Sequence, residues 1–283
     1  MTSVVAWVSV DSRGQSGLYF ASDSRITWPR GGKWEHCRKI FHSGTQPEIF
    51  GFCGDVIFPS QALSQIVGMI DSGWLYNDVN TVTEKFSRVV AVVKSLYRGY
   101  PISESADYEI IHGFREGSGN NTKFSLGTIS WSTKSGFTDT LVEIADNPKP
   151  FINEPQYAGT RLIVAKGSGV KAIRAAIRSW EDSDVGGTSR AIFSGFCQSI
   201  ESGADSKTGG APQLCGLYRG GHGRALGVVS NGKRYIAGMP VEGSLVASGI
   251  EWRNSNFERC DPSTGDVKSG AQRQPAPGNV SKN

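Results

Sequence analysis

The chain alternates between blocks of short apolar runs and pairs of amphipathic segments, and this order restricts its fold more than any other feature. Three blocks hold apolar and β-branched runs broken by Gly, Ser and Pro, the pattern of strands: 3–52, 108–165 and 213–236. Four segments repeat apolar residues every three or four positions, the pattern of helices: 60–70, 81–97, 170–177 and 188–202. This order predicts an α+β fold with two stacked antiparallel sheets between outer helix layers, a four-layer α/β/β/α sandwich.

We predict a single domain over residues 2–253, followed by a tail. A chain of 283 residues is long enough to bury a full core. Within the domain, Thr81-Val82-Thr83-Glu84 has the capping-box pattern that begins a helix. From residue 254 onward Pro, Gly, Ser, Gln and Asn dominate, and apolar residues become sparse. Because such a segment buries little apolar surface, residues 254–283 are expected to form a polar, disordered tail.

The composition argues against several classes of protein. The five cysteines are an odd number without a CxxC pair, which is expected of a reducing compartment rather than of a disulfide scaffold. The net charge of +4 is spread along the chain, so no nucleic-acid surface is predicted. The sequence shows neither a bilayer-spanning apolar run nor a secretory signal, so we expect a cytoplasmic protein without a membrane partner.

The residue that follows the initiator methionine can carry chemistry. Thr2 is small, and a methionine before a small residue is normally trimmed in the cytosol, which would leave a threonine with a free α-amino group. Such a residue holds a nucleophilic hydroxyl and a base together. The reference pKa of an α-amine is about 8, close to ambient pH, so the amine can accept the proton of the hydroxyl.

Five short motifs follow in a fixed order. They are Asp23-Ser24-Arg25, Arg38-Lys39-Ile40, Gly51-Phe52-Cys53-Gly54-Asp55, Gly167-Ser168-Gly169 and Asp205-Ser206-Lys207-Thr208-Gly209-Gly210. Asp23 and Lys39 are sixteen residues apart, and Ser168 and Asp205 are thirty-seven apart. In this order and spacing, residues 2–240 resemble the proteasome-type N-terminal-nucleophile (Ntn) hydrolases, the family of proteasome β subunits and bacterial HslV-like peptidases.

The resemblance implies that this chain is a threonine endopeptidase with seven catalytic residues: Thr2, Asp23, Lys39, Gly54, Ser168, Asp205 and Thr208. Thr2 would attack a peptide carbonyl and form an acyl-enzyme ester. The cation of Lys39 would favour the developing alkoxide, and Asp23 would be the partner that a buried lysine needs. Without the resemblance, Asp23 and Lys39 would be interpreted as solvated charges at the ends of short strands.

The remaining catalytic residues would stabilise and orient. The backbone N–H of Gly54 would form the oxyanion hole, and Asp55 departs there from the commonest Gly-Gly form of the motif. Ser168, Asp205 and Thr208 would hydrogen-bond the α-amine. Thr208 stands where the family usually has serine, and the change keeps the hydroxyl.

The resemblance also indicates a primary specificity pocket. Four apolar residues would line it: Ile26, Cys37, Phe52 and Val56. Such a pocket would accept a hydrophobic or small neutral side chain before the cut, whereas ordinary core packing is the alternative for all four. Arg25 would pair with Asp205, with a surface role as the alternative.

No cofactor or metal is predicted, because His36, Cys37 and His42 lack a fourth ligand for zinc. The resemblance implies a peptide or unfolded-protein substrate, assembly into a homo-oligomeric ring and an ATP-dependent unfoldase as partner. Three alternatives stay open: a non-catalytic ring or scaffold subunit, an Ntn amidohydrolase acting on a small amide, and a binding protein that never loses Met1.

Overall fold

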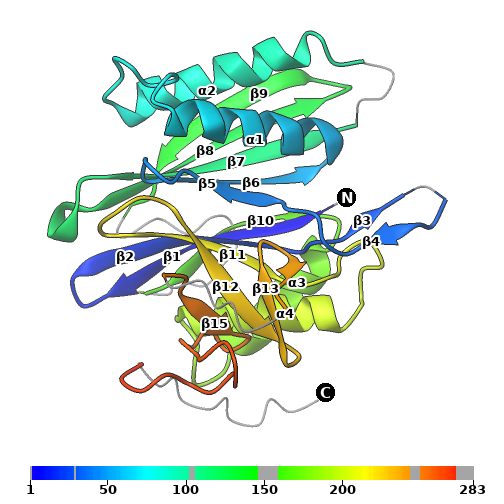
Figure 1. The fold of residues 1–283 in the computed structure, drawn as a ribbon, viewed down its shortest axis with the longest axis vertical. Coiled ribbons are helices and arrows are strands. Elements are labelled where there is room, and N and C mark those ends of the chain that lie inside the picture. The colour runs from blue at the N-terminus through cyan, green and yellow to red at the C-terminus, as the bar shows by residue number, and fades with distance from the viewer. Residues whose placement is uncertain (1, 29, 102–105, 146–158, 243–248, 272–283) are drawn as a thin grey trace.

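The computed structural model describes every residue except 1, 29, 102–105, 146–158, 243–248 and 272–283 (Figure 1). Its helices are α1 (Ile57–Asp71), α2 (Val82–Tyr97), α3 (Val170–Glu181) and α4 (Ser189–Glu201). Its strands are β1 (Ser3–Asp11), β2 (Gly14–Ser22), β3 (Ile26–Thr27), β4 (Lys33–Trp34), β5 (Ile40–His42), β6 (Glu48–Gly54), β7 (Tyr108–Glu116), β8 (Lys123–Ser132), β9 (Gly136–Glu143), β10 (Arg161–Gly167), β11 (Gln213–Tyr218), β12 (Arg224–Ser230), β13 (Lys233–Ile236), β14 (Met239–Pro240) and β15 (Trp252–Asn254).

Two sheets carry most of the described strands. The smaller sheet has the order β5-β6-β7-β8-β9, and the larger has the order β10-β1-β2-β11-β12-β13-β14, with β15 added beside β12. Neighbouring strands in both sheets are antiparallel except for the parallel pair β12–β15. The mixed fold with antiparallel sheets that the sequence predicts is therefore confirmed.

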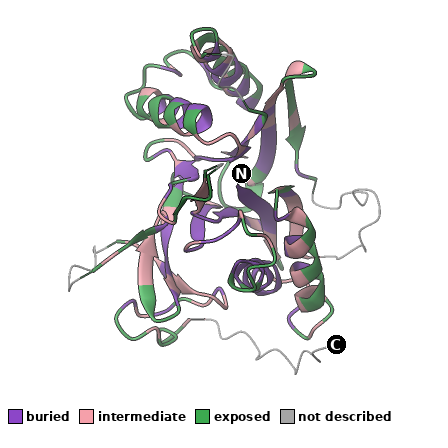
Figure 2. Ribbon diagram, turned by 90° about the vertical axis from the view of Figure 1, so that its right-hand side faces the viewer, coloured by how far each residue is buried: buried purple, intermediate pink, exposed green. Residues whose placement is uncertain are grey.

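The helices cover the sheets in two pairs. Figure 1 shows α1 and α2 beside the smaller sheet, and α3 and α4 on the far side of the larger sheet. Apolar side chains fill the space between α1, α2 and the smaller sheet, between the two sheets, and between the larger sheet and α3 and α4. Figure 2 shows the outer helix faces exposed and the strands between the helix pairs largely buried.

Strand β1 is covered on both faces, which explains why its sequence is apolar at nearly every position. Val4 and Ala6 belong to the cluster between the sheets, whereas Val5 and Trp7 belong to the cluster beneath α3 and α4. Successive side chains of a strand point to opposite faces, so a strand buried on both faces needs an apolar residue at each position. Strand β1 is in this way fixed at the centre of the molecule.

The helix start predicted at residue 81 is confirmed. The Thr81 hydroxyl accepts a hydrogen bond from the backbone N–H of Glu84 at 3.3 Å, and the Glu84 carboxylate accepts one from the backbone N–H of Thr81 at 3.2 Å. These reciprocal bonds satisfy two donors that the first turn of α2 would otherwise leave without partners. None of the described helices is both long and apolar enough to cross a lipid bilayer.

The expectation of a disordered tail from residue 254 is wrong for residues 254–271. Phe257 is 6% exposed, and its ring lies 5.7 Å from that of Trp7 and 5.6 Å from that of Phe193. Cys260 is buried as well. A few well-placed apolar residues attach this polar segment to the larger sheet, a feature that average composition does not show. Residues 272–283 of the predicted tail lie outside the described residues.

Replacement of Phe257 by alanine should lower the free energy of unfolding by about 3–5 kcal/mol, because it removes a buried aromatic ring from the cluster beneath α3 and α4. Urea unfolding measures the loss. Val267→Ala in the same segment is the control, since this half-exposed side chain should change stability by no more than about 0.5 kcal/mol. Equal, small losses for both variants would show that the segment does not stabilise the domain.

Candidate active site

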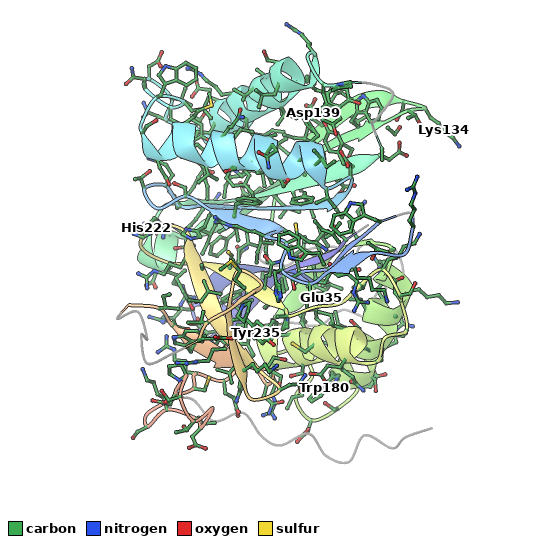
Figure 3. All side chains as sticks on the ribbon, turned by 45° about the vertical axis from the view of Figure 1, so that its right-hand side comes forward. Glu35, Lys134, Asp139, Trp180, His222 and Tyr235 are labelled. Atoms are coloured by element: carbon green, nitrogen blue, oxygen red, sulfur yellow. The ribbon has the colours of Figure 1, made fainter. Side chains whose placement is uncertain are left out.

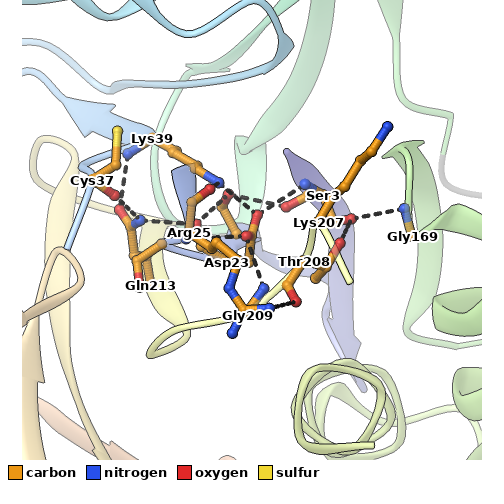
Figure 4. A network of polar contacts seen from close by, with 12 residues as sticks. Ser3, Asp23, Arg25, Cys37, Lys39, Gly169, Lys207, Thr208, Gly209 and Gln213 are labelled. Carbon is orange, nitrogen blue, oxygen red and sulfur yellow. Dashed lines mark hydrogen bonds and ion pairs between the residues drawn. The ribbon is translucent and has the colours of Figure 1, made fainter. Parts of the chain in front are cut away.

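A buried ion pair lies where β2 ends and β5 begins. The Nζ of Lys39 lies 2.9 Å from Oδ1 of Asp23, and neither side chain is exposed to solvent. Lys39 Nζ also donates to the Arg25 carbonyl at 2.5 Å (Figure 4). Strand ends place both residues: Asp23 follows β2 directly, and Lys39 immediately precedes β5.

Four hydrogen bonds or ion-pair contacts satisfy the Asp23 carboxylate. Oδ1 accepts from the backbone N–H of Ser3 at 2.9 Å and from Lys39 Nζ at 2.9 Å. Oδ2 accepts from the N–H of Arg25 at 3.2 Å and from that of Gly209 at 3.1 Å. Burial of a charge is tolerated only when such partners compensate its lost hydration. The pair therefore joins four segments that are distant in the sequence.

Gln213 holds the backbone around this pair, and sequence reasoning missed it. Its Nε2 donates to the Asp23 carbonyl at 3.0 Å and to the Cys37 carbonyl at 2.7 Å, and its Oε1 accepts from the N–H of Lys39 at 3.0 Å. Gln213 is fully buried at the start of β11. The sequence does contain a sign of this role: Gln213 begins an apolar strand, Gln213-Leu214-Cys215. A glutamine in a buried strand needs hydrogen-bond partners for its side-chain amide.

Thr2 precedes β1 beside this centre. The side chain of Thr2 is fully buried, and its Oγ1 has no hydrogen-bond partner among the described residues. The next residue, Ser3, donates its backbone N–H to Asp23 and accepts from the N–H of Asp23 at 3.3 Å. The peptide that follows Thr2 is thus bound directly to the carboxylate that pairs with Lys39.

A second polar network reaches Ser3 through the hydroxyl of its side chain. Asp205 Oδ2 accepts from the Ser168 hydroxyl at 2.6 Å and from the Thr208 hydroxyl at 2.7 Å. Since Thr208 gives its proton to Asp205, the 2.7 Å contact between the Thr208 and Ser3 hydroxyls requires Ser3 to donate. The Ser3 oxygen in turn accepts from the N–H of Gly169 at 3.1 Å.

The structure therefore brings Ser168, Asp205 and Thr208, which the resemblance implies to act together, into one network, and it connects them to Ser3. Among the described residues, none of the three makes a hydrogen bond to Thr2. Sequence reasoning overlooked Ser3 because a single serine at the start of an apolar strand carries no motif.

The environment of Asp205 favours its charged form. Burial alone would raise the pKa of Asp205, but hydrogen bonds from Ser168, from Thr208 and from the backbone of Lys207 outweigh it and hold this pKa below its ordinary value. A charged Asp205 fixes the direction of the chain of hydroxyl bonds that ends at Ser3.

Gly54 ends β6 in a conformation that only glycine adopts easily. Its φ is +94°, and a Cβ there would collide with the Asp107 carbonyl oxygen. The neighbouring Asp55 binds the backbone where α1 begins: its carboxylate accepts from the N–H of Val56 at 2.7 Å and from that of Ile57 at 3.3 Å. The departure from Gly-Gly at Asp55 thus has a local structural reason. No hydrogen bond joins Gly54 to Thr2 in the described part of the chain.

The four residues predicted to line one pocket lie in two places. Cys37 is 5% exposed and is bonded through its N–H to the Ser24 carbonyl, and Ile26 is half-buried at the start of β3. Phe52 is instead part of the core beneath α1 and α2, and Val56 packs against that same core. Strand alternation is the reason: Cys53, the next residue of β6, packs in the cluster between the sheets, so Phe52 points the opposite way.

Arg25 does not pair with Asp205, contrary to the sequence-based expectation. Its Nη2 lies 2.9 Å from Glu35 Oε1, and its Nη1 donates to the carbonyls of Ser206 and Thr208, both at 3.1 Å. Figure 3 labels Glu35 at the base of the hairpin formed by β3 and β4. Arg25 therefore ties this hairpin to the loop that contains Asp205.

Within the described ranges, no group of three or more His, Cys, Asp or Glu side chains is placed to hold a metal ion. All five cysteines are free and buried. Burial also raises the pKa of the Cys37 thiol, the cysteine nearest in sequence to Lys39.

Comparisons with known proteins give a likeness only among solved structures. No model of a protein family matches the sequence, and no curated protein matches it either. The chain is similar to eukaryotic HslV from Trypanosoma brucei, with 12% identity over 76% of this chain and 99% of that one and a TM-score of 0.43. It is also similar to a Gly-1 mutant of Anbu from Hyphomicrobium sp. strain MC1, with 13% identity over 80% and 87% and a TM-score of 0.49. Likenesses of this size carry no conclusion about activity or assembly.

Removal of one member of the buried ion pair should be costly. Lys39→Met leaves Asp23 buried without its cation and should lower the free energy of unfolding by about 3–5 kcal/mol. Asp23→Asn should cost a similar amount, and the double variant should cost less than the sum, because no uncompensated charge is left.

Urea unfolding of the two single variants and the double variant measures these energies. The matched control is Lys94→Met, which breaks a solvent-exposed pair with Asp139 (2.8 Å) and should cost no more than about 1 kcal/mol. A loss for Lys39→Met as small as that for Lys94→Met would contradict the account of a desolvated pair.

The lowered pKa of Asp205 predicts a pH dependence of stability. A carboxyl whose pKa is lower in the folded than in the unfolded state stabilises the fold above its unfolded pKa of about 3.9. This contribution is lost as the pH falls through the folded pKa. The stability difference between the wild type and Asp205→Asn should therefore be largest at neutral pH and shrink below about pH 4.

Urea midpoints between pH 2 and 7 measure this difference. Asp182→Asn, which alters an exposed carboxyl at the end of α3, should leave the midpoints close to those of the wild type throughout. A constant difference for Asp205→Asn across the range would contradict a role for its charge.

Proposed function

We propose that this protein is a proteasome-type Ntn hydrolase, a threonine endopeptidase with the α/β/β/α sandwich of that family. The observation that carries the proposal is the fully buried Lys39–Asp23 pair, whose carboxylate is bonded to the peptide N–H of Ser3. Apolar residues of similar volume in place of the ion pair would stabilise the fold at least as well, so stability alone does not explain the pair. A buried cation beside the first strand fits a reaction in which an oxygen of Thr2 becomes negative.

The reaction begins once Met1 has been removed. The Thr2 hydroxyl attacks the carbonyl carbon of a peptide, and its proton passes to the free α-amine of the same residue. The oxyanion intermediate collapses to an ester on Thr2, and the α-ammonium returns the proton to the leaving amine. Water then attacks the ester and, with the α-amine again as base, releases the acid and regenerates Thr2.

The surrounding residues take the roles that the sequence resemblance gives them, with two changes. The N–H of Gly54 donates to the oxyanion, and Ile26 and Cys37 contact the side chain before the cut. Phe52 and Val56 are left out of the pocket because Phe52 lies in the core beneath α1 and α2 and Val56 packs against it. Ser168, Asp205 and Thr208 act through Ser3, which they hold in place.

The wider biology of the proposal rests on the sequence resemblance. The protein would act in the cytoplasm on peptides or unfolded proteins, with no metal or cofactor. It would assemble into a homo-oligomeric ring that encloses the active sites, and an ATP-dependent unfoldase would supply its substrates.

A non-catalytic subunit of the same fold is the second candidate. It is favoured by the complete burial of Thr2, whose hydroxyl has no hydrogen-bond partner among the residues that the structure describes. In a protein that kept Met1, the nitrogen of Thr2 would be part of a peptide bond and could not act as a base, and the buried Thr2 hydroxyl would not be accessible. A small-amide hydrolase would share the Thr2 chemistry and differ in its substrate.

Intact mass before and after treatment with a peptide epoxyketone tests the proposal. The purified protein should lack Met1 and gain the mass of one inhibitor, and peptide mapping should place the adduct on Thr2. An epoxyketone adduct forms with both the Thr2 hydroxyl and the Thr2 α-amine, so it shows that both groups are free and reactive.

The control variants are Thr2→Ala, which should gain no mass, and Lys39→Met, which should react at least about tenfold more slowly if it folds. Retention of Met1 with no adduct on the wild-type protein would rule out the peptidase and favour the non-catalytic subunit. An adduct without hydrolysis of any peptide would favour the small-amide hydrolase.

A further inference from the structure

The chain between Asp23 and Lys39 forms a hairpin that extends away from the sheets (Figure 1). Its strands β3 and β4 pair with each other and with no other described strand. Ile26 is opposite Trp34, and Thr27 is opposite Lys33. A two-stranded ribbon without further support is marginally stable by itself, so its exposed residues need a separate explanation.

One face of this hairpin is apolar. Directly opposed residues and residues two apart in a strand share a face, so Ile26, Trp28 and Trp34 lie on the same side. Trp28 is opposite Gly32, to which it donates a backbone hydrogen bond at 2.9 Å, and the missing side chain leaves room beside the indole ring. Trp28 and Trp34 are 49% and 48% exposed. Two half-exposed indoles on one face are an interaction surface rather than core.

The base of the hairpin is fixed to the candidate active site. Glu35, directly after β4, pairs with Arg25, directly before β3. The Ser24 hydroxyl donates to the Glu35 carbonyl at 2.6 Å, and Lys39 Nζ donates to the Arg25 carbonyl. The apolar face thus begins at Ile26, one residue beyond a contact of the catalytic lysine, and continues outward through the two tryptophans.

The hairpin is also positively charged. Arg30 and Lys33 are exposed, and residues 26–34 contain no acidic side chain. No ion pair joins either cation to another residue in the described ranges. Lys33 is opposite Thr27, on the other face from the tryptophans, and Arg30 lies in the turn, so the positive charge surrounds the apolar face. Charge complementarity therefore favours an acidic partner that contacts the hairpin through apolar side chains.

We propose that the β3–β4 hairpin is a docking arm for the polypeptide substrate, which it binds through an extended stretch of acidic and apolar residues away from the cut bond. The apolar face ends at Ile26 beside the contact between Arg25 and Lys39, so an extended substrate chain is long enough to occupy the tryptophans and reach the candidate active site. Tryptophan side chains bind such chains at low entropic cost, because they have only two rotatable bonds. That the bound polypeptide is a substrate rests on the proposed function, but binding of a polypeptide to the hairpin does not require catalysis.

The test measures binding in the Thr2→Ala background, where no substrate is consumed. The probe is fluorescein-labelled β-casein, an acidic and largely unfolded polypeptide, and the readout is fluorescence anisotropy. Trp28→Ala/Trp34→Ala should raise the dissociation constant at least about tenfold, as expected for two aromatic anchors. Arg30→Glu/Lys33→Glu should weaken binding as well and reduce its dependence on salt.

The matched control is Trp74→Ala, which removes a 67% exposed tryptophan from the connection between α1 and α2. Its dissociation constant should stay within about twofold of the parent value. Circular dichroism melts show whether each variant folds, and native mass spectrometry gives its oligomeric state.

Three results would overturn the docking arm: no binding of β-casein by Thr2→Ala, equal binding by the hairpin and Trp74 variants, or a smaller oligomer in Trp28→Ala/Trp34→Ala. The last would identify a second copy of this chain as the occupant. A wild-type protein that gains no epoxyketone adduct would instead refute the proposed peptidase, and it would leave the binding result standing.

Discussion

The buried pair between Asp23 and Lys39 is the interaction on which the rest of the site depends. A carboxylate and an ammonium without solvent contact are stable only when every remaining hydrogen-bonding position is filled. Asp23 reaches that condition by accepting from the backbone of Ser3, Arg25 and Gly209. The requirement of one charge thereby fixes the start of β1, the base of the hairpin and the loop after α4 relative to one another.

Ser3 connects this centre to the second polar network. Its backbone binds Asp23, and its hydroxyl donates to the Thr208 hydroxyl, which in turn donates to Asp205. Ser3, the residue directly after Thr2, is therefore bonded to both networks, one of which contains the cation of Lys39. These bonds fix the start of β1, where a chain end would otherwise fray.

Patterns that act over a few residues could be predicted from the sequence, and contacts over long separations could not. The capping box at Thr81 is local, and it is present as predicted. Gln213 binds residues more than 170 positions away, and no periodicity encodes such a contact. The resemblance places Phe52 in a pocket, whereas strand alternation points its side chain into the core beneath α1 and α2. The burial of Phe257 could not be predicted from composition, because one apolar residue changes the average composition of a polar segment very little.

Two forms of the protein that differ only before Thr2 test the proposed chemistry most directly. One is released from a fusion so that it begins with Thr2 and a free α-amine, and the other retains Met1. Hydrolysis of the same fluorogenic peptide is measured for both. The form with the free amine should be faster by about 10²–10⁴, the contribution expected of a positioned base. Equal rates in the two forms would show that Thr2 is not the nucleophile.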